Sequence, residues 1–253
     1  MPYYGSLLPL LVAQDYIESA FTVGDWLRTH SNHGDQPWQP PETIKQIPYL
    51  NAEYTKMWHL TYRGHPGISA PSMPLVQFIA YQQGISLPEE YGRSFLEVND
   101  PKVEEEANKI QFSHMSMEQA LKEHRLVTYS FNEQYAEPKK AFFETLWMRC
   151  EAEDIWFFDV STVGWKEAAW LIKKSLVYVG CRSACWVLAN GVGKTTITFE
   201  PHPSRHKSCH LGLVFGNPFG SEIALPFGMP PAVAADTAAS LIRKIREERM
   251  VAA

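Results

Sequence analysis

The sequence lacks a long hydrophobic run and contains few cysteines. No apolar stretch among the 253 residues reaches the roughly 18–20 residues that a membrane-spanning helix needs. No Lys or Arg precedes the apolar stretch within residues 1–16, which argues against a signal peptide. The four cysteines form no regular framework, as expected for reduced thiols. We therefore expect a cytoplasmic protein without transmembrane segments.

The sequence also contains no internal repeats and no low-complexity tracts, so we expect a folded chain without a repeated unit. Its hydrophobic content of 45% and charged content of 20% are ordinary for a globular protein. A length of 253 residues is long for one domain and short for two. We expect a mostly helical region at 1–135 and an α+β region at 136–253, although the two could form one continuous domain.

Charge is unevenly distributed along the chain. Residues 1–159 contain 12 Lys+Arg and 22 Asp+Glu, for a net charge of −10, whereas residues 160–253 contain 11 and 6, for +5. Such asymmetry can indicate a basic working surface in the second part. Equally, the two parts could neutralise each other across a shared interface, and the sequence leaves both interpretations open.

Helices are predicted in the first part by capping signals and by apolar residues on one helical face. The predicted N-terminal caps are Ser72, Ser86, Asp100 and Ser116. Residues 126–131 have the composition of a strand, and residues 139–149 that of another helix.

The second part alternates short apolar runs with helical periodicity. Predicted strands cover 155–160, 184–189, 192–200, 210–215 and 222–227. One predicted helix runs from Trp165 to Val179, ended by Gly180, and a last one begins at Pro231. The order β-α-β-β-β-β-α predicts an α+β fold with a largely antiparallel sheet.

The stretch Ala189–Thr196, ANGVGKTT, ends like a phosphate-binding loop. A complete motif needs glycine where Leu188 stands, and it must lead into a helix. The following residues are β-branched and alternating, which favours a strand. We therefore interpret Asn190-Gly191 as the turn of a β-hairpin, with Lys194 on its wetter face. A nucleotide-binding protein remains an alternative.

A second candidate site is the His-rich loop 202–210. Thiolates and imidazoles bind zinc, and the available ligands are Cys181, His202, His206 and Cys209. If Cys181 and Cys185 shared one strand, they would lie about 13 Å apart and could not bind the same ion. We therefore predict no cofactor, and keep as an alternative an enzyme with a zinc- or His/Cys-dependent site at this loop.

The most suggestive cluster is basic. The predicted hairpin and the adjacent loop bring together Arg182, Lys194, Arg205, His206, Lys207 and His210. Cations beside sheet aromatics can hold a nucleic-acid backbone. The sequence thus favours a non-enzymatic interaction protein whose basic C-terminal sheet face binds a polyanion, such as nucleic acid, or an acidic protein partner.

Overall fold

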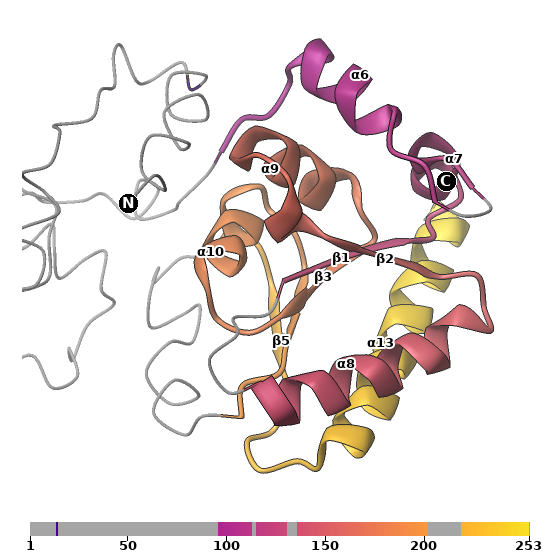
Figure 1. Ribbon diagram of the computed structural model, residues 1–253, viewed down its shortest axis with the longest axis vertical. Helices are drawn as coiled ribbons and strands as arrows, with labels where there is room; N and C mark the ends of the chain where they lie inside the picture. The colour runs from indigo at the N-terminus through magenta and orange to yellow at the C-terminus, as the bar shows by residue number, and fades with distance from the viewer. Residues whose placement is uncertain (1–13, 15–95, 113–114, 131–135, 202–218, 253) are drawn as a thin grey trace, which may run out of the picture. The chain divides into compact units, whose positions relative to one another are not determined.

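The computed structural model describes residue 14 and residues 96–112, 115–130, 136–201 and 219–252 (Figure 1). The chain divides into two compact units. All of the described residues belong to the unit formed by 2–21, 94–211 and 218–253. None of the described helices is long and apolar enough to cross a membrane.

Helices and strands alternate along this unit. In chain order they are α6 (Pro101–Asn108), α7 (Met117–Lys122), β1 (Leu126–Ser130), α8 (Ala136–Glu151), β2 (Trp156–Asp159), the 3-10 helix η3 (Val160–Thr162), α9 (Trp165–Lys174), β3 (Val177–Gly180), α10 (Ala184–Gly191), β4 (Thr196–Thr198), β5 (Glu222–Ala224) and α13 (Pro231–Ala252).

The five strands form one sheet in the order β2-β1-β3-β4-β5, and every pair is parallel. The prediction of a largely antiparallel sheet is therefore wrong, while a mixture of helices and strands is confirmed. Parallel neighbours need a crossover connection, usually a helix. Here α8, α9 and α10 provide the first three crossovers.

The predicted hairpin at Asn190-Gly191 is wrong because residues 184–191 form α10 rather than a strand. Asn190 and Gly191 are the last residues of that helix, and Gly193 takes the left-handed conformation just after it (φ +74°). A short apolar run fits a buried strand and a buried helix equally well. Asn and Gly are typical both of hairpin turns and of helix C-termini.

The predicted helix from Trp165 to Val179 is two elements. Helix α9 ends at Lys174, Ser175 caps it, and β3 follows at once. Val177 and Val179 continue the apolar spacing of the helix, but they are buried β-branched residues of a strand. The segment 184–189, which was predicted as a strand, lies in α10, as described above.

Other predictions are confirmed. Strands were expected where β1, β2, β4 and β5 lie, and helices where α8 and α13 lie. Asp100 caps α6 by accepting a hydrogen bond from Lys102 N at 3.0 Å. Ser116 caps α7 in the same way, through Gln119 N at 3.1 Å. The predicted caps Ser72 and Ser86 and the strand at 210–215 lie outside the described residues.

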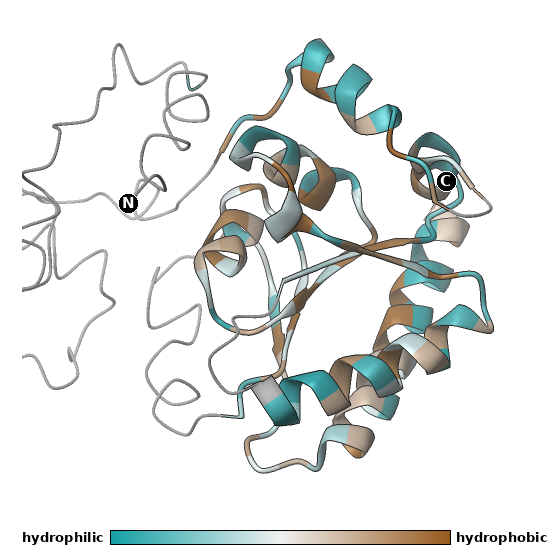
Figure 2. Ribbon diagram, viewed as in Figure 1, coloured by the Kyte–Doolittle hydropathy of each residue, from teal (hydrophilic) through white to brown (hydrophobic). Residues whose placement is uncertain are grey.

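One face of the sheet packs against α8 and α13, and the other lies toward α9 and α10 (Figure 1). Strand side chains alternate in direction, so Val127, Val177 and Ile197 share the first face. They are buried with Phe142 of α8 and Ile242 of α13. In Figure 2 both helices carry hydrophobic and hydrophilic residues, as expected for helices buried on one side only.

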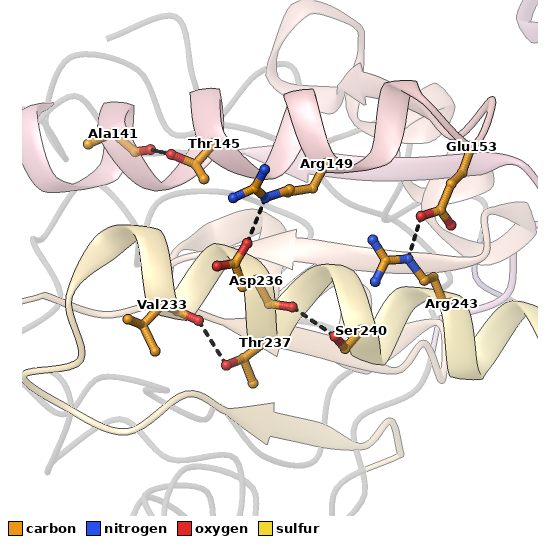
Figure 3. Close-up of polar contacts among 9 residues, drawn as sticks. All are labelled: Ala141, Thr145, Arg149, Glu153, Val233, Asp236, Thr237, Ser240 and Arg243. Atoms are coloured by element: carbon orange, nitrogen blue, oxygen red, sulfur yellow. Dashed lines mark hydrogen bonds and ion pairs between the residues drawn. The ribbon is translucent and has the colours of Figure 1, made fainter.

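Ion pairs join the outer surfaces of α8 and α13 (Figure 3). Arg149 Nε lies 2.7 Å from an oxygen of Asp236, and Arg243 Nε lies 2.5 Å from Glu153 Oε1. These side chains are 36–55% exposed, so each pair stabilises the fold by at most about 1 kcal/mol. The apolar contacts beneath them contribute most of the stability of this layer.

The second face of the sheet is unusually polar. Parallel strands buried on both faces normally carry continuous apolar side chains. Here the α9–α10 side carries the apolar residues Leu126, Trp156 and Phe158 at the β1–β2 end, but also the polar residues Thr128, Ser130, Tyr178, Thr196, Thr198 and Glu222. The hydroxyls of Thr128 and Ser175 lie 3.0 Å apart within this layer, and both residues are fully buried.

Candidate functional site

The connections of β1 and β3 define the candidate site. From β1 the chain crosses to β2 through α8, and from β3 it crosses to β4 through α10. These helices lie on opposite faces of the sheet (Figure 1), so the connections that leave the two neighbouring strands diverge at the carboxyl ends. In open α/β sheets, ligands bind in the crevice at such a topological switch point. The strands end here at Ser130 and Gly180.

Close packing at this point requires glycine at position 180. A Cβ atom there would lie 2.6 Å from the Ser130 carbonyl oxygen and 2.7 Å from the Tyr178 hydroxyl. The Tyr178 hydroxyl donates to that carbonyl at 3.4 Å. Burial raises the pKa of Tyr178 well above its ordinary value, so the phenol stays protonated and remains a donor. The absence of a side chain at Gly180 therefore lets the Ser130 carbonyl and the Tyr178 hydroxyl pack directly against the end of β3.

Helix α10 begins at the same edge, and its N-terminal cap is incomplete. Ser183 occupies the capping position but its side chain makes no capping hydrogen bond. Its Oγ is buried and lies against the Tyr178 hydroxyl instead of capping the helix. The first amides of a helix lack intrahelical partners and bind anions well. An anionic group of a ligand would satisfy both the amides and this hydroxyl.

Arg182 lies beside this cap and reaches the edge strand β5. Its Nη2 is 3.0 Å from Glu222 Oε1, and both side chains are only 2% exposed. The same oxygen accepts a hydrogen bond from Thr198 Oγ1 at 2.8 Å. Nε and Nη1 of Arg182 make no hydrogen bond with any residue that the structure describes. A buried guanidinium retains donors for another acceptor at the carboxyl edge.

Cys181 and Cys185 also lie at this edge, but not on one strand as expected. Cys181 follows β3 and Cys185 is the second residue of α10, so the separation of about 13 Å expected for one shared strand does not apply. Burial raises the pKa of Cys185, which disfavours a reactive thiolate. The described residues contain no group of three potential metal ligands. His202, His206 and Cys209 lie outside them, so the zinc hypothesis stays a prediction.

Lys194 lies at the opposite, amino edge of the sheet. Its Nζ donates to the Ser175 carbonyl oxygen at 2.6 Å, and the residue is 4% exposed. The prediction that it faces solvent on a hairpin is therefore wrong. Burial, together with the nearby Arg249, lowers its pKa to about 7. The ANGVGKTT stretch leads from a helix into a strand, the reverse of a phosphate-binding loop.

Two of the six predicted polyanion-binding residues, Arg182 and Lys194, are thus buried at opposite edges of the sheet. The structure does not bring them onto one surface. The other four lie outside the described residues: Arg205, His206, Lys207 and His210. The polyanion hypothesis now depends on these four and stays a prediction.

Sequence reasoning missed Ser183 and Gly180 as site residues. The signal was present, because a serine before an apolar run is typical of a helix N-terminus. It was not used because residues 184–189 were interpreted as a strand. The fold defines the class: a doubly wound, parallel α/β domain with a topological switch point between β1 and β3. Comparisons of the chain with protein-family models, curated proteins and solved structures found no match.

Proposed function

We propose that this domain binds a small phosphorylated metabolite at the carboxyl edge of its sheet, between the ends of β1 and β3. The observation that carries the proposal is the strand order 2-1-3-4-5 with α8 and α10 on opposite faces. Ligands of doubly wound domains bind at this point because the diverging connections leave a crevice there.

The chemistry of the edge supports a phosphate group as the anchor. The N-terminus of α10 carries a partial positive charge of roughly half an elementary charge. Ser183 adds a buried hydroxyl that lies against the Tyr178 hydroxyl and does not cap the helix. Arg182 adds a cation whose Nε and Nη1 are without a described acceptor. Gly180 lets the Tyr178 hydroxyl, which bonds the Ser130 carbonyl, pack at the end of β3 beside Ser183.

The test is calorimetric titration of the full chain with inorganic phosphate and with adenine, guanine and uridine nucleotides. We expect at least one nucleotide to bind more tightly than phosphate, because the crevice offers further contacts. In Ser183→Ala the affinity should fall roughly tenfold, the value of one hydrogen bond to a charged group. Its folding stability should fall by less than about 1 kcal/mol, because the hydroxyl does not cap α10 and Tyr178 keeps its hydrogen bond to Ser130 O.

Ser116→Ala is the matched control, since Ser116 caps α7 and does make its hydrogen bond. That variant should lose about 1 kcal/mol of stability and bind the ligand normally. If no compound of the panel binds with a dissociation constant below about 1 mM, the proposal is refuted. The same holds if Ser183→Ala binds as tightly as the parent chain.

Cellular location is part of the proposal. Cys150 and Cys185 are buried free thiols, and reduced cysteines support a cytoplasmic protein. Fractionation of cells that produce the full chain, followed by thiol labelling in denaturant, would test this. Recovery of the protein in an oxidised, disulfide-linked form outside the cytoplasm would contradict it.

A further inference from the structure

Two cations converge on a single carbonyl oxygen at the amino edge of the sheet. Lys194 Nζ lies 2.6 Å from Ser175 O, and Arg249 Nη1 of α13 lies 3.3 Å from the same atom. Ser175 is the C-terminal cap of α9, and Lys194 immediately precedes β4. Elements distant in the sequence therefore place an ammonium and a guanidinium side by side.

The described residues supply little negative charge to this pair. Neither cation pairs with a described carboxylate, and the only charged group that acts on Lys194 is Arg249 itself. The nearest compensation is the C-terminus of α9, equivalent to roughly half a negative charge. Lys173 and Lys174 add further positive charge in the last turn of that helix. Positive charge therefore exceeds negative charge at this point.

Burial makes this excess costly. Lys194 is 4% exposed, and an isolated charge is poorly tolerated away from water. Without an anion, the site can respond only by releasing the lysine proton, and the pKa of Lys194 is accordingly lowered to about 7. Arg249 stays charged and is only half-buried, so part of this residue faces solvent. A bound dianion would instead keep both groups protonated and paired.

We propose that Lys194 and Arg249 form a binding site for a tetrahedral oxyanion, of the phosphate or sulfate class, at the amino edge of the sheet. The oxyanion accepts hydrogen bonds from both cations while Ser175 O keeps its place at the end of α9. This site is separate from the crevice at the carboxyl edge, so neither proposal depends on the other. Its chemistry suits a phosphate or sulfate ester as well as the free ion.

Sulfate is the probe, because its charge does not change between pH 6 and pH 9. Urea unfolding of the full chain is measured in sodium sulfate and in sodium chloride of equal ionic strength. Sulfate stabilises proteins generally through exclusion from their surfaces, and that effect is common to all variants. Binding at this site adds a further increment to the unfolding free energy, and that increment grows only logarithmically once the sulfate concentration exceeds the dissociation constant. We expect Lys194→Met and Arg249→Gln each to weaken the apparent sulfate affinity on the order of tenfold or more.

Two controls separate this site from other effects. Lys244→Met removes a lysine of α13 whose side chain is 72% exposed, and it should keep the increment. Ser183→Ala alters the carboxyl edge and should also keep it. A Lys194→Met variant that fails to fold leaves Arg249→Gln as the decisive variant, because Arg249 lies near the end of α13 and is half-buried.

Proton linkage gives an independent signature. Sulfate binding favours the charged form of Lys194, so above pH 7 each binding event takes up a proton. The sulfate affinity of the parent chain should therefore fall with rising pH, approaching about tenfold per unit between pH 8 and pH 9. The proposal would be overturned if sulfate raised the unfolding free energy equally in all variants. A sulfate affinity of the parent chain that does not change with pH would also overturn it.

Discussion

The buried amine of Lys194 makes stability depend on pH in a predictable direction. Its pKa is about 7 in the folded chain, against an ordinary value of 10.5. Between these values the unfolded chain binds one more proton than the folded chain, so the free energy of unfolding rises with pH. The stabilisation is complete above pH 10.5 and is lost as the pH falls through 7. From pH 7 to pH 10 the gain is about 3–4 kcal/mol.

Lys194→Met removes this titration while it keeps a long apolar side chain. We expect the difference in unfolding free energy between the parent chain and the variant to change by about 3–4 kcal/mol from pH 7 to pH 10. As the pH rises, the parent chain should gain unfolding free energy relative to the variant. Urea unfolding in chloride buffers at several pH values measures it, and the difference is needed because other groups titrate in the same range. Burial raises the pKa values of Cys150 and Cys185, for example, which lowers stability above pH 8 or so.

Lys140→Met is the control, because the Lys140 side chain is 65% exposed. Its difference from the parent chain should stay constant with pH to within about 0.5 kcal/mol. A Lys194→Met variant that shows the same flat difference would refute the reasoning. It would mean that Lys194 is charged in the folded chain throughout this range.

Two further predictions concern packing. Phe142→Ala should lower the unfolding free energy by about 3–5 kcal/mol, because Phe142 is fully buried and stacks on Phe199 at 4.6 Å between ring centroids. Trp147→Ala on the same helix should lower it by less, since Trp147 is 44% exposed. Equal losses for the two variants in urea unfolding would contradict this prediction. Gly193→Ala should destabilise more than Gly228→Ala, although both residues have positive φ, because only at Gly193 would the added Cβ meet the Phe219 ring, at 2.9 Å. The Gly228 variant should lose about 1 kcal/mol of unfolding free energy. A greater loss there than at Gly193 would contradict the predicted clash with the Phe219 ring.

The sequence determined most of the individual elements. Local capping and periodicity were sufficient for α6, α7, α8 and α13, because these signals act within a few residues. Short β-branched and aromatic runs were sufficient for β1 and β2. None of these signals depends on which other segment the element contacts.

Tertiary structure alone decided strand direction and therefore the site. Residues 184–191 are apolar enough for a buried strand or a buried helix, and Asn190-Gly191 suits the end of either. Only packing against the neighbouring elements makes the segment a helix, and that one outcome turns an antiparallel hairpin into a parallel crossover. It also moves Ser183 to a helix N-terminus at the switch point.

The burial of Lys194 was likewise decided in three dimensions. The sequence predicts an exposed Lys194 just after the Asn190-Gly191 turn, since lysine is rarely buried. Its position follows from contacts with Ser175 and Arg249, which lie 19 and 55 residues away in the sequence numbering. Separations of this size are invisible to local patterns, because the free energy of burying a charge depends on every group that the fold places around it.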